Sequence, residues 1–161
     1  MSVVVLATAC GEPMEAHSFI ALERDFQDYA TWESVSFETT VLEGTEGEGH
    51  TGGARTVFLS ARPPEGATEW PIGTRVVKEL HETGTIFAMA KRGGTYNAKG
   101  VVGWEWFGLQ RDATGTLRIA WRGLGAPLGG EYGNSSAACN SCHGSLKSLD
   151  GVMTPQFQLG H

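Results

Sequence analysis

Most of the chain is divided into short runs of β-branched and aromatic residues, with only a few residues between them. In the run VSFETTVL, Val35, Phe37, Thr39 and Val41 alternate with polar residues, a period of two that is typical of a strand. Five more runs of strand length follow: RTVFLS, TRVVKELH, TIFAMAKR, VVGWEWFGL and TLRIAW. No long helical crossover separates them, so the sequence predicts an antiparallel sheet.

Two of the connections between these runs have the length and composition of hairpin turns. HETG joins a strand expected over Arg75–His81 to one over Thr85–Lys91, and RDATG joins Val101–Leu109 to Leu117–Trp121. Short loops that contain glycine favour antiparallel hairpins. We therefore expect both pairs of strands to be neighbours in the sheet.

Helices are expected only at the two ends of this sheet. In RDFQDYATWESV, Phe26, Tyr29 and Trp32 are three residues apart, which predicts one face of a short helix. Near the C-terminus, a serine at position 135 or 136 is a suitable N-cap for AACNSCHGSLKSL, which predicts a helix that ends at Asp150-Gly151. The predicted fold class is α+β: a mainly antiparallel sheet, a short N-terminal helix and a C-terminal helix.

Length and charge limit the classes of protein to which the chain can belong. Its 161 residues suffice for one domain, which we assign to residues 17–161. A net charge of −6 without a basic run argues against nucleic acid, and no apolar run is long enough to span a bilayer. The start, SVVVLATAC, resembles the end of a lipoprotein signal with Cys10 as the lipid anchor. The alternative for residues 1–16 is a flexible tail with a free thiol.

The C-terminal helix carries the sequence CNSCH, which has the form C-x-x-C-H. Cys139 and Cys142 are one helical turn apart and His143 follows directly. This is the attachment motif of haem c, because two thiols at this spacing reach the two vinyl groups of one porphyrin and the histidine ligates the iron. A thioredoxin-like pair would require a βαβ unit, and zinc would require a further ligand such as His161 or Cys10. We expect one covalently bound haem c.

A lysine in TRVVKELH is the second candidate site residue. Lys78 shares its face of the predicted strand with Thr74, Val76 and Leu80, where an ammonium group is costly unless it is paired, neutralised or chemically altered. The opposite face, which we expect to be solvated, carries Arg75, Val77, Glu79 and His81. The alternative is that Lys78 extends past the edge of the sheet or pairs with a buried carboxylate.

From about Tyr29 to His143 the chain resembles the cytochrome P-460 family. The resemblance rests on Y-x-x-W in an early helix, RTVFLS, PIGTRVVKELHETG and a late CNSCH, in that order. It implies a mostly antiparallel β fold similar to that of the cytochromes c-prime-beta. It also implies a homodimer and a five-coordinate haem with an open distal face.

The resemblance further implies a role for each matching residue. Cys139 and Cys142 would form the thioethers, His143 would be the proximal ligand, and Lys78 would form a further covalent bond to a meso carbon of the porphyrin. The carboxylate expected just ahead of the first cysteine is replaced by Ala138. Glu131 lies in a glycine-rich loop and is not assigned its role.

Three functions are compatible with these residues. The first is hydroxylamine oxidation with nitric oxide chemistry, with Lys78 as the catalytic residue, a small nitrogen compound as substrate and a protein redox partner. The second is nitric oxide binding without turnover, in a pocket built from aromatic residues: Phe37, Phe58, Phe87, Trp104, Trp106 and Phe107. The third is plain electron transfer, although neither Met89 nor Met153 is placed like a dedicated sixth ligand.

Haem c is attached outside the cytoplasm, so we expect a periplasmic protein that is either free or lipid-anchored. The histidines beyond the motif are expected to be solvated rather than ligating: His17, His50, His81 and His161.

Overall fold

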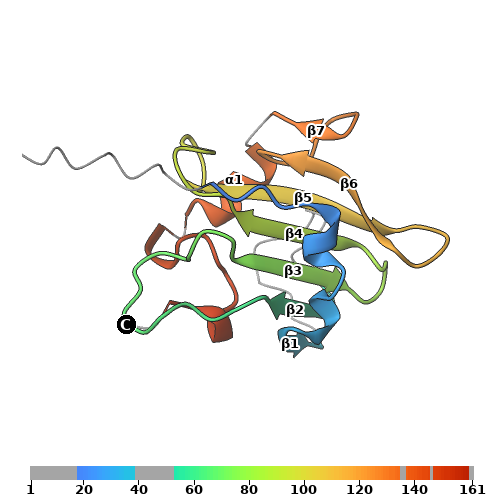
Figure 1. The fold of residues 1–161 in the computed structure, drawn as a ribbon, viewed down its shortest axis with the longest axis horizontal. Helices are drawn as coiled ribbons and strands as arrows, with labels where there is room; N and C mark the ends of the chain where they lie inside the picture. Colours follow the sequence, from blue (N-terminus) through green and yellow to red (C-terminus); the bar gives the residue numbers. More distant parts are fainter. Residues whose placement is uncertain (1–17, 39–52, 135–136, 146, 160–161) are drawn as a thin grey trace, which may run out of the picture.

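The computed structural model describes residues 18–38, 53–134, 137–145 and 147–159. In these ranges seven strands form one sheet, in which strand order follows sequence order (Figure 1). The strands are β1 (Glu33–Phe37), β2 (Arg55–Leu59), β3 (Arg75–Leu80), β4 (Ile86–Lys91), β5 (Trp104–Arg111), β6 (Leu117–Gly123) and β7 (Tyr132–Gly133). Neighbouring strands from β1 to β6 are antiparallel, whereas β7 is parallel to β6.

Both predicted hairpins are confirmed. β3 pairs with β4 and β5 pairs with β6, in each case antiparallel. The first predicted strand corresponds to β1, which ends at Phe37, and Thr39 and Val41 lie outside the described residues.

The two faces of the sheet pack against different parts of the chain. One face carries Val57, Val76, Met89 and Trp106, which form a core with C-terminal residues such as Phe157. The other face carries a second core under the N-terminal turns, made of Phe58, Val77, Ala88 and Phe107 with Phe26 and Tyr29. The alternation along each strand distributes apolar residues to both faces. The sheet therefore has a packed core on each of its two faces.

The predicted N-terminal helix is wrong. The segment forms two 3₁₀ turns, η1 (Glu23–Phe26) and η2 (Tyr29–Thr31), drawn in blue across the sheet in Figure 1. A spacing of three residues between aromatic side chains matches the three-residue period of a 3₁₀ turn better than the α-helical period. Phe26 and Tyr29 are buried against the sheet from these turns.

The predicted long C-terminal helix is also wrong, and with it the α+β class. Helix α1 covers only Ala137–His143 and turns away at Gly144, a residue that disfavours continuation of a helix. Two more short 3₁₀ turns follow, η3 (Lys147–Leu149) and η4 (Pro155–Phe157). The described chain is thus mainly a β-sheet with short helical turns.

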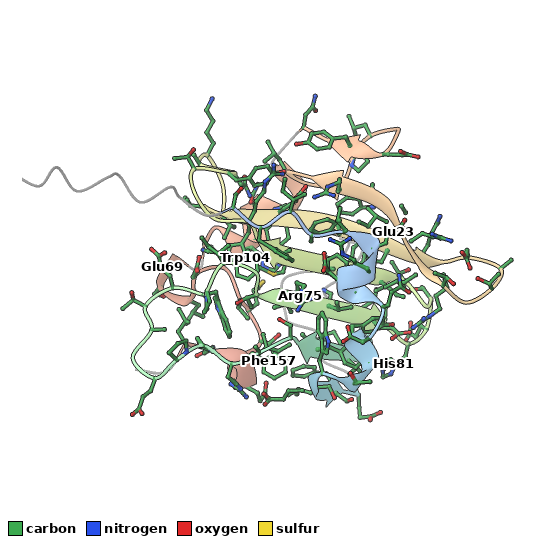
Figure 2. The ribbon with its side chains drawn as sticks, viewed as in Figure 1. Glu23, Glu69, Arg75, His81, Trp104 and Phe157 are labelled. Carbon is green, nitrogen blue, oxygen red and sulfur yellow. The ribbon has the colours of Figure 1, made fainter. Side chains whose placement is uncertain are left out.

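The face of β3 that was expected to be solvated is largely covered: His81 at its end is exposed as expected, but Arg75 and Glu79 are half-buried. Val77 is fully buried, Glu79 accepts a 2.7 Å hydrogen bond from the Tyr29 hydroxyl, and Arg75 donates to the Asp25 carbonyl. Figure 2 labels Arg75 and Trp104, which belong to the two opposite faces. The N-terminal turns supply the polar partners that a solvated face would have found in water. Nowhere in the described ranges is a helix long and apolar enough to cross a membrane.

Candidate functional site

Helix α1 brings the predicted attachment residues to a cavity on the C-terminal side of the sheet. Cys139, Cys142 and His143 all line this cavity, and Lys78 of β3 lines it as well. Cys139 is buried and Cys142 is half-buried, and both are free thiols. The structure therefore places all four predicted site residues around one space, from segments more than sixty residues apart in the sequence.

The cavity has a volume of about 350 Å³ and a mainly apolar wall. Its charged side chains among the described residues are Lys78 and Arg55, and no carboxylate of the described chain is part of the wall. The sheet contributes Phe37, Val57, Val76, Phe87, Ala88, Met89, Trp106, Phe107 and Trp121. The C-terminal segment contributes Val152, Met153, Thr154 and Pro155 beyond the motif. A flat apolar cofactor with two thiol attachment points suits this wall.

The surroundings of His143 favour a neutral imidazole in which one ring nitrogen donates a hydrogen bond. Its Nδ1 lies 2.6 Å from the Gly151 carbonyl oxygen, which can only accept, so Nδ1 carries the proton. Burial lowers the pKa of His143, the hydrogen bond to Gly151 opposes this, and nearby Lys78 lowers the pKa further. The unprotonated Nε2 is then the atom available to a metal.

The indole of Trp106 lies beside the same imidazole, with ring centroids 4.6 Å apart. This contact and the Gly151 hydrogen bond fix the ring from two sides. A hydrogen bond from the second ring nitrogen to a backbone carbonyl, like the one to Gly151, is common for histidines that bind metals.

Helix α1 is held in place by Asn140, a residue that the sequence analysis did not select. Its Oδ1 accepts from Asn97 Nδ2 at 2.9 Å and from the Val101 amide at 3.0 Å, and Trp106 Nε1 lies at 3.3 Å. Its Nδ2 donates to Asn97 Oδ1 and to the Leu124 carbonyl, each at 3.1 Å. The carboxamide between the two cysteines is therefore fully satisfied and anchors the motif to the sheet. No pattern in the sequence links position 140 to these partners.

Gly100 provides the space for this anchor. A Cβ added at Gly100 would lie 2.3 Å from the Asn140 Cγ atom, closer than any real contact. Gly108 has a similar role at the wall of the cavity, since an added Cβ would lie 2.1 Å from Trp121 Nε1. The absence of a side chain at these two glycines leaves room for Asn140 and Trp121 to approach the backbone closely.

Lys78 lies between Val57 and Phe87 in the register of the sheet. Its Nζ is 5.9 Å from the centre of the Phe87 ring. Burial, and after it the positive charge of Arg55, lower the pKa of Lys78 to about 8, against an opposing effect of the two cysteines. Lys78 thus supplies a neutral amine at a pH where ordinary lysines are charged.

In the haem-free chain, we expect the lowered pKa of Lys78 to determine how fast a small amine-reactive reagent modifies this side chain at each pH. Reductive methylation of Lys78 should reach a plateau above about pH 8, below the range in which a lysine side chain titrates in a model peptide. Mass spectrometry of the Lys78 peptide after short pulses at several pH values measures the rate. A rate that continues to rise up to about pH 10, as in a model peptide, would contradict the lowered pKa.

Of the aromatic residues expected to form the pocket, Phe37, Phe87, Trp106 and Phe107 line the cavity, whereas Phe58 and Trp104 do not. Phe58 belongs to the core under the N-terminal turns and Trp104 to the core around Phe157. Trp121 was missed. A period of two would place it on the same face as Ile119, but a β-bulge at Gly108/Leu109 leaves Ile119 against the core under the N-terminal turns and brings Trp121 to the cavity.

The remaining candidates lie elsewhere. His81 is exposed and lies 2.9 Å from the Thr56 hydroxyl, away from the cavity, and Glu131 is exposed. Cys10 and the other three histidines that were considered, His17, His50 and His161, lie outside the described residues. Within the described part of the chain, no three His, Cys, Asp or Glu side chains form a group that could hold a metal ion by themselves.

Comparisons with protein-family models, with curated proteins and with solved structures give no match for this chain. The site is therefore interpreted from its own residues and from the resemblance in its motifs.

Proposed function

We propose that this chain is a mono-haem c-type cytochrome of the P-460 type, which binds a small nitrogen compound at an open axial position of the iron. The observation that carries the proposal is the state of His143. Its Nδ1 is committed to the Gly151 carbonyl at 2.6 Å, and the ring lines a cavity together with both cysteines of the attachment motif. A free nitrogen on an oriented, neutral imidazole is what ligation of iron requires.

Each residue of the site has a defined task in this proposal. Cys139 and Cys142 would hold the haem through thioethers, and His143 would ligate its iron through Nε2. When bound, the haem would supply a redox-active iron for a small nitrogen compound. The apolar wall, including Phe87 and Trp106, excludes water from the ligand.

Lys78 is proposed as a further attachment point to the porphyrin, because its amine faces the same cavity as the thiols. Formation of this bond replaces one N–H and one C–H bond by an N–C bond, so an oxidant such as a peroxide has to accept two electrons and two protons. A pKa of about 8 leaves a useful fraction of the amine neutral and nucleophilic near neutral pH.

The reaction proposed first is oxidation of hydroxylamine, with electrons passed to a protein redox partner. Nitric oxide binding without turnover is the second candidate, and the described wall of the cavity favours it in one respect. Oxidation of hydroxylamine releases protons, yet no described carboxylate lines the cavity to accept them. If Lys78 is consumed by the cross-link, it cannot serve as the base either.

Electron transfer is the third candidate, and the cavity bears on it too. Met89 and Met153 both line the wall, and a methionine sulfur is a common sixth ligand of haem c. The proposal of a P-460-type cytochrome also includes a periplasmic location, a homodimer and a lipid anchor at Cys10.

The optical spectrum of the reduced protein distinguishes these functions. A red-shifted band, together with a Lys78 peptide bound to porphyrin in a mass map, supports the P-460 type. We expect Lys78→Ala to keep the haem attached and to abolish the shifted band, because the thioethers do not depend on the amine. Lys99→Ala, at an exposed lysine, is the matched control and should leave the spectrum unchanged.

Two other outcomes would replace the first candidate. An ordinary five-coordinate spectrum with an unmodified Lys78 would indicate ligand binding alone. A sharp low-spin spectrum that is lost on substitution of Met89 or Met153 by alanine would indicate electron transfer.

A further inference from the structure

The carboxylate of Asp150 lies directly before the residue that accepts the hydrogen bond of His143. Lys91 Nζ contacts its two oxygens at 2.6 and 2.7 Å. Trp104 Nε1 donates to Oδ1 at 3.2 Å, and the Trp70 amide donates to Oδ2 at 2.9 Å. These contacts come from β4, from β5 and from the segment that precedes β3. None of them is needed to line the cavity, so their role lies elsewhere.

The backbone at this point has an unusual shape. Asp150 and Gly151 have φ values of +45° and +77°, so two successive residues lie in the left-handed region. Residues other than glycine rarely adopt this conformation, and it persists where the surroundings impose it. A Cβ at Gly151 would also lie 2.5 Å from Val101 Cγ1, so the chain is pressed against the loop before β5. The side chain of Asp150 is anchored at this corner by its contacts with Lys91, Trp70 and Trp104.

We propose that Asp150 is a positioning residue for the axial ligand. By fixing the corner, it directs the Gly151 carbonyl at His143 Nδ1 and so sets the tautomer, the orientation and the basicity of the imidazole. A carbonyl acceptor on Nδ1–H makes the imidazole a stronger donor through Nε2. The redox consequence of this inference rests on the proposed function, because it requires a bound haem. The effect on the orientation and tautomer of His143 concerns the protein alone.

The geometric part is tested on the haem-free chain by nitrogen NMR of the His143 ring. In the unsubstituted chain the Nδ1–H tautomer should predominate. In Asp150→Gly, which permits the same backbone angles but removes the anchor, this preference should fall roughly fivefold, the worth of one hydrogen bond. Asp150→Asn is the matched variant. It also leaves Lys91 without a counterion, but its amide oxygen can still accept the hydrogen bond from Trp104 Nε1. It should stay close to the unsubstituted chain.

The same variants test the redox part in the haem-loaded protein. A weaker imidazole donor favours ferrous over ferric iron, so Asp150→Gly should raise the midpoint potential by about 59 mV, a tenfold change for a one-electron couple. Asp150→Asn should shift it much less. If Asp150→Gly does not fold, Asp150→Gly and Asp150→Asn are compared in a chain that also carries Lys91→Met. This third substitution removes the Lys91 ammonium, which would otherwise be buried without its counterion.

Arg122→Met provides a control for general loss of stability. It breaks the ion pair between Arg122 and the buried Glu105 on the opposite face of the sheet, where Arg122 Nε lies 2.8 Å from Glu105 Oε1. It should leave the tautomer and the potential unchanged. Unchanged signals in Asp150→Gly, or equal shifts in Arg122→Met, would overturn the inference. Failure to attach haem in the unsubstituted chain would instead refute the proposed function and leave the tautomer measurement valid.

Discussion

The double variant Cys139→Ser/Cys142→Ser is expected to carry no covalently bound haem. Both thiols line the cavity and no other described cysteine can replace them. A serine hydroxyl does not form the thioether, so any porphyrin that enters the cavity would leave on denaturation. Haem staining of a denaturing gel, together with the intact mass of the chain, measures the result after production in a host that assembles c-type cytochromes.

Two matched variants complete this experiment. Cys10→Ser makes the same exchange outside the motif and should retain haem, provided that export is supplied by an attached signal sequence. His143→Ala should retain the thioethers but change the spectrum, since it removes the ligand and leaves the thiols. Haem staining that persists in the double cysteine variant would refute attachment through the motif. An unstained unsubstituted chain would remove the basis for all three candidate functions.

The strand pattern and the hairpins were predictable because they depend on residues that are close in sequence. The period-two runs indicate where the strands lie, and the short turns at HETG and RDATG indicate which strands pair. The helices were not predictable in the same way. Phe26 and Tyr29 are compatible with an α-helix and with 3₁₀ turns, and packing against the sheet decides between these.

The candidate site shows the same division. Cys139, Cys142 and His143 are recognisable from their spacing, and Lys78 from its position on an apolar strand face. That they meet at one cavity depends on how α1 is placed on the sheet. Asn140 achieves this through partners that are 16 to 43 residues away in sequence. Contacts of this kind have no local signal.

The assumption that one face of β3 would be solvated failed for a related reason. Arg75 and Glu79 are charged, yet the N-terminal turns supply a hydrogen-bond partner to each, the Asp25 carbonyl to Arg75 and the Tyr29 hydroxyl to Glu79. A charged residue in a strand therefore indicates the need for a polar partner, and water is only one of the available partners. The same reasoning applies to the buried Lys91 on the other face.

We expect Lys91→Met to lower the free energy of unfolding by about 3–5 kcal/mol, the range for removal of one partner from a buried ion pair. The Lys91 and Asp150 side chains are only 7% and 12% exposed, with 2.6 Å between Nζ and Oδ2. Loss of the ammonium leaves a carboxylate in a position that water barely reaches. Guanidinium unfolding followed by circular dichroism measures the change, which corresponds to a Tm lower by roughly 10 °C.

The exposed pair of Arg62 and Glu33 provides a matched control. Its charged atoms are also 2.6 Å apart, but its side chains are 46% and 49% exposed. Arg62→Met should therefore cost less than about 1 kcal/mol. In the double variant Lys91→Met/Asp150→Asn the buried charge is gone, so it should be more stable than Lys91→Met alone. Equal losses for Lys91→Met and Arg62→Met would show that burial does not set the strength of the Lys91–Asp150 pair.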